Sequence, residues 1–357
     1  MKKVIYFLLA GSLVYASCGG GQPNTENTNN SSQAVTPEDQ ELLKQAQGLF
    51  KILPIDAGTP EHAITKEKVA LGKMLYFDTR LSNTGKNSCN TCHNLATFGV
   101  DNEVTSLGDA GKRGTRNSPT TFNAALHFVQ FWDGRAKDVE EQAGMPILNH
   151  IEMNMASKDA LVKRLGAVAE YKDLFAKAFP ENKGAFTYDN IGDAIGNFER
   201  TLLTPSKFDS YLGGNINALS SEERNGLHEF INVGCTTCHA GVALGGAMYQ
   251  KFGLVSDYRP LTGSKGNDQG RKDITKDDFD KDMFKVPSMR NITKTQPYFH
   301  DGSVSDLAKA IKIMGKVELN KDLTDTQVSS IITFLETLTG DLPADVKAAP
   351  GGLVAAK

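Results

Sequence analysis

Apolar residues recur at steps of three and four along most of the chain, the spacing that places them on one face of an α-helix. The pattern is strong enough to predict helices at 42–50, 66–77, 138–143, 158–178, 188–203, 221–231, 304–314 and 324–338. No long stretch alternates apolar and polar residues as a half-buried β-strand would. Thr36 followed by Pro37 is typical of a helix N-terminus, so folded sequence is expected to begin there. The pattern predicts an all-α fold with long loops.

Two short motifs use four of the five cysteines in the chain. They read Cys89-Asn90-Thr91-Cys92-His93 and Cys235-Thr236-Thr237-Cys238-His239. Two thiols at this spacing can hold a porphyrin through two thioether bonds, and the histidine that follows can ligate its iron. Zinc is the alternative, since Cys-x-x-Cys is also half of a zinc site, but each motif would then need further ligands. The motifs predict two covalently bound haem c groups.

A second pattern repeats downstream of the two motifs. Pro119 and Pro287 each open a segment that contains an asparagine, Asn123 or Asn291, and an Asp-Gly pair begins fourteen residues after each proline. A chain of 357 residues is long enough for two domains. We therefore predict two cytochrome c-like haem domains related by internal duplication, at 37–204 and 205–345, followed by a tail at 346–357.

The N-terminus has the features of an export signal. Two lysines precede an apolar run, and small residues lead to Cys18, which predicts a signal peptide at 1–17. Small residues before a cysteine resemble a bacterial lipobox, although Tyr15 stands where leucine is usual. We expect Cys18 to be lipidated and 18–36 to be a flexible tether. A plain signal peptide with an incidental cysteine is the alternative. Both versions agree with thioether attachment of haem, which takes place outside the cytoplasm.

The charge pattern excludes some partners. The net charge is −3, and basic residues do not form separate tracts. This gives no reason to expect binding to nucleic acid or electrostatic attraction to an anionic membrane. We expect contact with a membrane only through the lipid anchor.

The two halves differ where a sixth iron ligand could come from. Met314 lies thirteen residues after Asp301, while the same count from Asp133 reaches Pro146, which cannot ligate iron. A Met/His pair raises the potential of a haem and suits electron transfer. Other residues could compete for either haem, although each of them alone is more often a surface or core residue than a ligand: Met145, Met248, Met283, Met289, His62, His127, His150, His228 and His300.

Glu152 is the candidate base in the first half. It stands in the short stretch 150–154 among apolar and amide residues. Chemistry on a peroxide at an open iron needs a base that moves a proton, and a carboxylate can do this. Spacing alone does not separate this role from that of an ordinary acidic residue.

These residues resemble the bacterial dihaem cytochrome c peroxidases from about residue 54 to residue 338. The resemblance is carried by the stretches 71–78, 89–94, 116–120, 130–136, 284–287 and 297–302. It implies reduction of hydrogen peroxide to water with two electrons from a small soluble donor, such as a cytochrome c or a copper protein. It also implies a periplasmic homodimer.

The resemblance assigns roles residue by residue. The haem held by Cys89, Cys92 and His93 is then the peroxidatic one. The haem held by Cys235, Cys238 and His239, with Met314 as distal ligand, then accepts electrons from the donor. The family pattern further assigns acid/base chemistry, a pocket amide and an interhaem indole to Glu152, Gln142 and Trp132, and calcium binding to Asn117, Thr295 and Pro297, the last two through backbone carbonyls.

One loop departs from the family pattern. Many members have a histidine after the first haem motif that caps the peroxidatic iron in the oxidised state. The loop 105–111 has Asp109 at that position. We therefore expect the first iron to be open at rest, unless His127 or Met145 caps it.

Two other functions remain as alternatives. A dihaem electron carrier would have six-coordinate irons, and the presence of Glu152 and Gln142 argues against it. The related enzymes that oxidise a tryptophan cofactor precursor in methylamine dehydrogenase share the expected fold. Their second haem has a tyrosine as distal ligand, whereas this chain offers Met314.

Overall fold

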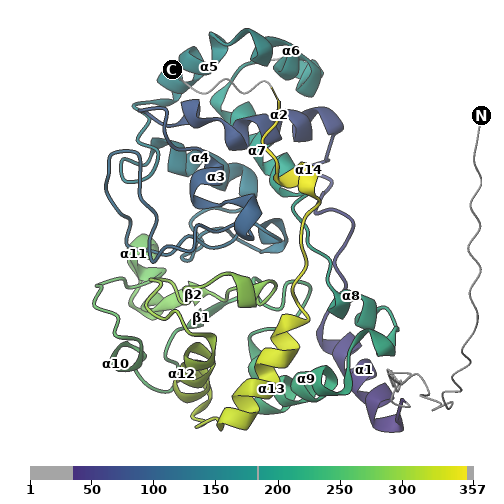
Figure 1. The fold of residues 1–357 in the computed structure, drawn as a ribbon. Helices are drawn as coiled ribbons and strands as arrows, with labels where there is room; N and C mark the ends of the chain where they lie inside the picture. Colours follow the sequence, from purple (N-terminus) through teal and green to yellow (C-terminus); the bar gives the residue numbers. More distant parts are fainter. Residues whose placement is uncertain (1–34, 183–184, 352–357) are drawn as a thin grey trace, which may run out of the picture. The chain divides into compact units, whose positions relative to one another are not determined.

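The computed structural model describes residues 35–182 and 185–351 (Figure 1). The predicted signal peptide, Cys18 and nearly all of the tether lie outside the described residues. The described chain is largely helical, as the apolar pattern predicts. Its helices are α1 Pro37–Leu49, α2 Lys66–Phe77, α3 Cys89–Cys92, α4 Val139–Leu148, α5 Lys158–Gly166, α6 Ala169–Ala178, α7 Tyr188–Glu199, α8 Lys207–Leu212, α9 Ser221–Val233, α10 Arg259–Thr262, α11 Lys272–Thr275, α12 Leu307–Leu319, α13 Asp325–Glu336 and α14 Ala344–Lys347. Among the described residues, we find no helix with the length and apolar character needed to cross a membrane.

Side-chain caps determine where several helices begin. The Thr36 hydroxyl accepts a hydrogen bond from the Asp39 backbone N–H at 3.2 Å, so α1 begins at Pro37 as expected. The Asp138 carboxylate accepts from the Glu141 N–H at 2.9 Å and begins α4. Such caps satisfy N–H groups that have no partner within the helix.

Several predicted helices have other bounds in the structure, and two of these differences have a clear cause. The stretch 158–178 forms α5 and α6, separated at Ala167 and Val168. Gly166 weakens the helix there, and Val168 adopts an extended conformation with φ −89° and ψ 115°. The helix predicted at 304–314 begins later, at Leu307, because Asp306 caps it by accepting from the Lys309 N–H at 2.6 Å.

A small sheet was not expected from the pattern. Strands β1 Tyr249–Lys251 and β2 Met283–Lys285 pair antiparallel, with Gln250 opposite Phe284. Each strand has three residues, too few for an alternating pattern to be visible in the sequence.

The apolar side chains form separate clusters. The first joins α2, α4, α5, α6 and α7 through residues that include Leu71, Leu75, Ile147, Leu161, Phe175 and Ile195. The second joins α1, α8, α9 and α13 through residues that include Ala46, Phe50, Phe208, Phe230 and Phe334. Two segments pack in the cluster that is formed mainly by the other half of the chain. α1 packs beside α8 and α9 in the second cluster (Figure 1), and Leu342 packs in the first.

The two repeated asparagines meet at one threonine. Asn123 and Asn291 are both fully buried and both have positive φ, at 61° and 60°. The side-chain amides donate to Thr204 Oγ1 at 2.8 and 2.9 Å. Thr204 is next to the predicted boundary, so corresponding positions of the two halves are tied together there.

The two Asp-Gly pairs also share one backbone arrangement. An isolated antiparallel bridge encloses each pair, Gln130 with Ala136 and Tyr298 with Val304. Gly134 and Gly302 have φ of 71° and 64°, a region that glycine adopts without steric cost.

Candidate active site

The first motif lies in a cavity built mainly by loops and α4. Cys89 and Cys92 occupy the single turn of α3, so their side chains leave the same face of the helix. Both thiols are free, and burial raises the pKa of Cys92 to about 11. His93, Glu152 and Trp132 line the same cavity.

The His93 ring is fixed by its neighbours. Its Nδ1 lies 3.0 Å from the Pro119 carbonyl oxygen, which can only accept, so Nδ1 carries the proton and Nε2 is left as a ligand atom. Burial lowers the pKa of His93, which favours the neutral imidazole that a metal needs. The Tyr76 hydroxyl donates to the His93 carbonyl at 2.6 Å and holds its backbone.

Glu152 reaches this cavity from a tight turn after α4. Asn149 builds the turn: its side chain accepts from the Ile151 N–H at 3.0 Å, and its carbonyl accepts from the Glu152 N–H at 3.0 Å. Burial raises the pKa of Glu152, while the charge of Arg135 and a hydrogen bond with Asn149 act in the opposite direction. A carboxyl with a raised pKa can exchange a proton at a pH closer to neutrality.

Gln142 and Pro146 extend from α4 into the first cavity. They lie four residues apart, so they share one helix face. Met145, the candidate capping methionine, is 38% exposed and does not line this cavity. His127 does line it, and its Nδ1 lies 3.1 Å from Lys285 Nζ.

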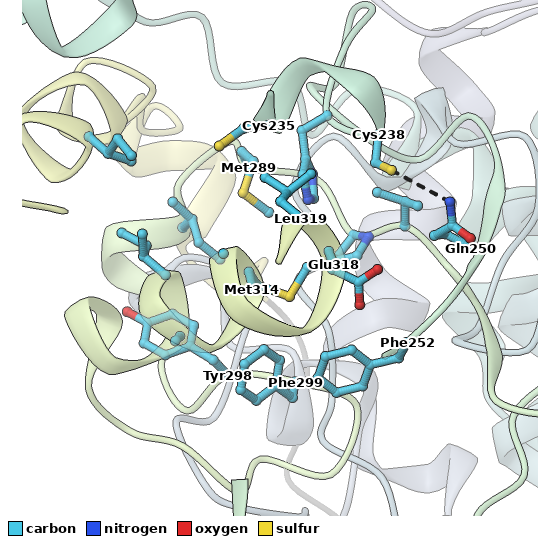
Figure 2. A pocket seen from close by; sticks show the side chains of 18 of the residues that line it. Cys235, Cys238, Gln250, Phe252, Met289, Tyr298, Phe299, Met314, Glu318 and Leu319 are labelled. Atoms are coloured by element: carbon cyan, nitrogen blue, oxygen red, sulfur yellow. Dashed lines mark hydrogen bonds between the residues drawn. The ribbon is translucent and has the colours of Figure 1, made fainter. Parts of the chain in front are cut away.

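The second motif lies in another cavity, lined largely by aromatic and aliphatic residues (Figure 2). His239 is oriented like His93: its Nδ1 lies 3.3 Å from the Leu244 carbonyl oxygen, which leaves Nε2 for iron. Burial lowers the pKa of His239 to about 4, so this ring is also neutral. The Gln250 amide lies 3.8 Å from Cys238 Sγ.

Met314 lines the second cavity from α12, and Met289 lines it as well (Figure 2). Met248 and Met283, the other competing methionines, are not among the residues that line it. The helix places Met314 where Pro146 stands in α4: each is eight residues after the aspartate that caps its helix, Asp306 or Asp138. The two positions found by counting in the sequence therefore each face a cavity.

Trp132 and Lys285 line both cavities. The Trp132 indole N–H donates to the Asn117 carbonyl at 2.9 Å, and the Trp132 carbonyl accepts from the Lys285 N–H at 2.7 Å. Lys285 is 6% exposed, and burial lowers its pKa to about 7. An aromatic ring and an amine thus stand at the junction of the two cavities.

Unpaired buried atoms show that both cavities fit a polar cofactor. His127 Nε2, His300 Nδ1 and Glu318 Oε2 are buried and have no hydrogen-bond partner. His127 lines the first cavity, and the other two line the second. Buried polar groups are almost always paired, and the propionates of a haem could accept hydrogen bonds from the His127 and His300 ring nitrogens. With the free thiols and neutral imidazoles, these atoms suit a haem in each cavity.

Of the three residues assigned to calcium, Asn117 lies at this junction, because it lines the first cavity and its carbonyl accepts from Trp132. Asn117 is buried, and its backbone N–H donates to the His300 carbonyl at 2.8 Å. Pro297 is buried and Thr295 is half-buried. The side chain of Asn102 donates to the Gln296 carbonyl between them at 2.8 Å. Carbonyl and amide oxygens are the type that calcium prefers.

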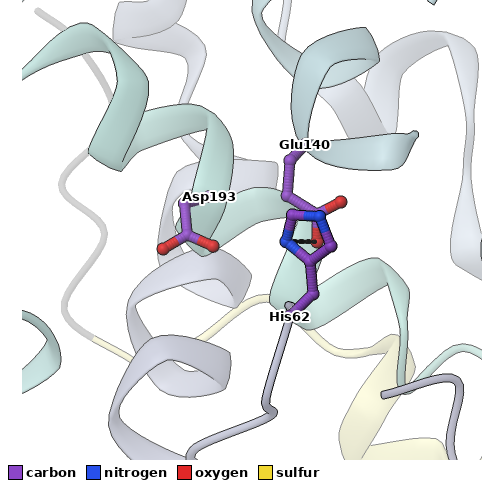
Figure 3. Close-up of side chains that lie close together, drawn as sticks. All are labelled: His62, Glu140 and Asp193. Atoms are coloured by element: carbon purple, nitrogen blue, oxygen red, sulfur yellow. Dashed lines mark ion pairs between the residues drawn. The ribbon is translucent and has the colours of Figure 1, made fainter. Parts of the chain in front are cut away.

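A separate group of His62, Glu140 and Asp193 has ligand atoms within 4.8 Å of one another (Figure 3). Its charges are already paired. Arg200 donates to both Glu140 oxygens at 2.6 and 2.8 Å, and Lys68 lies 2.7 Å from Asp193. The group is therefore better explained as an ion-pair network than as a metal centre.

Three lining residues were missed as candidates in the sequence: Arg135, Lys285 and Glu318. Arg135 and Lys285 lie inside the stretches that carry the resemblance, which was the only signal for them. His300 replaces Trp132 in the aligned halves, but a count of residues does not reveal an unpaired ring nitrogen. Nothing in the sequence pattern distinguishes Glu318 from a surface glutamate.

Known proteins match this chain over most of its length. A family model described as di-haem cytochrome c peroxidase matches residues 66–217. A cytochrome c551 peroxidase of Nitrosomonas europaea is 45% identical over 82% of this chain and 85% of its own. A cytochrome c551 peroxidase of Pseudomonas aeruginosa is 44% identical over 85% of this chain and 87% of its own.

A solved structure is also similar. The crystal structure of a MauG-like protein associated with microbial copper homeostasis superposes with a TM-score of 0.73, at 29% identity, over 84% of this chain and 96% of the other. The fold, the two motif cavities and the identity to named peroxidases agree. The chain therefore belongs to the di-haem cytochrome c peroxidase family and is a peroxidase with two sites for haem c.

Proposed function

We propose that the chain reduces hydrogen peroxide to water in the first cavity and receives electrons for this reaction through the second. The observation that carries the proposal is the difference between the cavities. Both have a Cys-x-x-Cys-His motif, but Glu152, Gln142 and Arg135 line only the first, and the methionine of α12 lines only the second. The reaction consumes two electrons and two protons per peroxide and forms two water molecules.

The cofactors would be held by the motif residues. Cys89, Cys92 and His93 hold one haem, and Cys235, Cys238 and His239 hold the other, with Met314 as its distal ligand. When bound, the two haems would supply the redox chemistry, with the electrons for cleavage of the O–O bond passing from the second site to the first.

The residues of the first cavity move the protons. Glu152, in its ionised form, accepts the proton of the peroxide oxygen that stays and delivers it to the oxygen that leaves as water. Arg135 keeps Glu152 ionised over a wider pH range, because its charge lowers the pKa of that carboxyl. Gln142 offers an amide that can orient the peroxide, and the fixed turn at Asn149 limits the movement of Glu152.

Trp132 would carry electrons between the two cavities, since its indole lines both. Its N–H is bound to a backbone carbonyl, which is too weak a base to take the indole proton. The ring therefore keeps its proton while electrons pass. The donor would be a small soluble protein of the periplasm, a cytochrome c or a copper protein.

Several finer assignments belong to the same proposal. Asn117, Thr295 and Pro297 would bind calcium at the junction of the cavities, where the ion would hold loops from both halves. The signal peptide would direct the chain to the periplasm, and Cys18 would anchor it by a lipid. We also propose a homodimer, by analogy with the family.

The two halves would be duplicated haem units. The matched positive φ values at Asn123 and Asn291, and the shared partner Thr204, support duplication. The haem-binding loops of each half would lie within the proposed domains, 37–204 and 205–345. The packing of α1 and Leu342 indicates that each end of the chain completes the core of the other unit.

Electron paramagnetic resonance of the fully oxidised, calcium-loaded protein tests the proposal. We expect one high-spin and one low-spin ferric signal, with the high-spin signal consumed by one equivalent of peroxide. This would agree with an iron left open where Asp109 replaces a capping histidine. Two low-spin signals that ignore peroxide would contradict the open site. If peroxide still failed to react after one-electron reduction, the proposed peroxidase chemistry would be wrong.

A further inference from the structure

Two loops donate hydrogen bonds to the backbone of the segment that carries Glu152. One is the turn 82–86, in which the Asn83 N–H donates to the Met153 carbonyl at 2.9 Å. The other is loop 105–111, in which the Asp109 N–H donates to the Glu152 carbonyl at 2.7 Å. Two consecutive carbonyls of the catalytic segment are therefore bound by residues distant in sequence.

The side chains of Thr84 and Asp109 join these two loops to each other. The Asp109 carboxylate accepts from the Thr84 backbone N–H at 2.8 Å and from the Thr84 hydroxyl at 2.5 Å. Hydrogen bonds to the ionised form lower the pKa of Asp109, although burial acts against them. At neutral pH the carboxylate is therefore charged, and charge-assisted hydrogen bonds of this kind are stronger than neutral ones.

Gly108 brings the loop and the catalytic segment into direct backbone contact. A Cβ atom at Gly108 would lie 1.7 Å from the Ile151 carbonyl oxygen and 2.9 Å from that of Glu152. Real Cβ atoms do not approach so closely, and a backbone carbonyl cannot rotate away as a flexible side chain can. Any side chain at this position would push residues 151 and 152 outward.

The turn 82–86 is itself firmly attached. The Ser82 hydroxyl accepts from the Lys86 and Asn87 backbone N–H groups at 3.1 and 3.0 Å. Arg164 of α5 donates to the Ser82 carbonyl at 2.6 Å. The Thr84–Asp109 pair thus connects Glu152 to a helix of the first core.

We propose that Thr84, Gly108 and Asp109 act as positioning residues that hold Glu152 at the peroxide site. This deepens the proposed function and rests on the acid/base role of Glu152. Loop 105–111 is then a fixed wall of the first cavity. Ser106 and Gly108 line this cavity, whereas Asp109 points its carboxylate to Thr84 and does not line it.

The catalytic consequence follows from geometry. A base must lie within hydrogen-bond reach of the proton it takes, and a misplacement of about 1 Å can cost about 10²-fold in rate. Asp109 and Thr84 touch neither substrate nor cofactor, so their loss should act through the position of Glu152. Haem attachment and electron uptake should stay unchanged.

Steady-state kinetics of the holoenzyme with hydrogen peroxide test the proposal. We expect Asp109→Ala to lower kcat/KM about 10- to 100-fold and Gly108→Ala about 100-fold, through displacement of Glu152. Thr84→Val keeps the backbone N–H and removes only the hydroxyl, so about a threefold loss is expected, the size of one lost hydrogen bond. The visible spectra of both haems and the KM for the donor should match the parent protein.

Two matched variants act as controls. Thr84→Ser retains the hydroxyl and should restore the parent rate and the parent pH profile. Ala110→Ser changes the exposed neighbour of Asp109 and should have no effect. If Gly108→Ala fails to fold, Thr84→Val and Asp109→Ala still test whether these residues position Glu152.

A double-mutant cycle with Glu152→Gln shows whether Asp109→Ala lowers activity through Glu152. Once Glu152 is removed, Asp109→Ala should cause no further loss, because the two residues act as one unit. An equal loss in both backgrounds would overturn the proposal, since Asp109 would then act elsewhere. Parent values of kcat/KM in both Thr84→Val and Asp109→Ala would overturn it too.

Hydrogen exchange separates this inference from the proposed function. The Asp109 amide should exchange faster in Asp109→Ala than in the parent, and residues 151–154 should lose protection, with no change in Thr84→Ser. Unchanged exchange in Asp109→Ala would overturn the positioning role even if Glu152 proves catalytic. Full activity of Glu152→Gln would instead contradict the acid/base role, while the exchange data still report whether the loops hold the segment.

Discussion

The two cavities contain the same five-residue motif and share Trp132 and Lys285, but they differ in most of their other lining residues. The first contains Glu152, Gln142 and Arg135, so charged and amide groups face the site. The second contains Met314 with Phe252, Phe299 and other apolar residues. A polar site can move protons, and a more apolar site with a soft ligand suits electron transfer.

The difference is concentrated in one helix position. α4 and α12 both begin after a capping aspartate, and the eighth residue after it faces a cavity, Pro146 in one and Met314 in the other. The side chain of proline offers no donor atom to a metal, whereas the thioether of methionine can ligate iron. We propose that this single position separates a site that is open to substrate from one that is closed.

The largest expected effect comes from removing Glu152, the proposed base of the first cavity. Glu152→Gln keeps the size and a polar tip but cannot accept a proton at neutral pH. We expect kcat/KM for peroxide to fall about 10²- to 10⁴-fold, the usual contribution of a general base. Stopped-flow mixing with peroxide measures this, and the reduction potential of the second haem should not change. A loss below threefold would contradict the role.

The second prediction makes the first cavity resemble the second. Pro146→Met places a thioether at the position equivalent to Met314. We expect the high-spin ferric signal to become low-spin and the reaction with peroxide to slow about a hundredfold, if the cap is in place about 99% of the time. Pro146→Ala is the control, because alanine keeps the helix and leaves the site open. A persistent high-spin signal in Pro146→Met would show that the two positions are not equivalent.

Both haem motifs and most of the helices could be predicted from the sequence, because these features depend on local patterns. Helix 66–77 was predicted with the bounds it has in the structure. The count that paired Pro146 with Met314 was also informative, since both positions face cavities. The break at Val168 was not predictable from periodicity, because apolar residues continue in helical register on both sides of it.

Contacts between distant segments could not be read from the chain. The packing of α1 in the second core depends on tertiary fit, since its apolar face would suit either half. Lys285 looks like a surface residue in sequence, yet it is buried at the junction of the two cavities. The Thr84–Asp109 pair joins two polar loops, and polar loop residues give no periodic signal.

The third prediction makes the second cavity resemble the first. Met314→Ala removes the thioether while alanine preserves α12. We expect the second haem to become accessible to external ligands and its potential to fall by on the order of 0.1 V or more, since axial ligands set haem potentials over a wide range. Potentiometric titration followed by visible spectra measures the change. Met289→Ala is the matched control in the same cavity, and an equal fall in potential there would leave the ligand assignment to Met314 unsupported.

The smallest expected effect concerns the pH at which the first cavity works. Glu152 must be ionised to accept a proton, so activity is full above its pKa and falls as the pH drops through it. The charge of Arg135 lowers that pKa, against the larger effect of burial. Arg135→Gln should therefore raise the pKa of Glu152 and move the acidic limb of kcat/KM to higher pH, with little loss at alkaline pH. Lys137→Gln, two residues away and exposed, should leave the profile in place. An acidic limb that does not move in Arg135→Gln would mean that another group than Glu152 controls it, and the contrast between a proton-transfer cavity and an electron-transfer cavity would then need a different base.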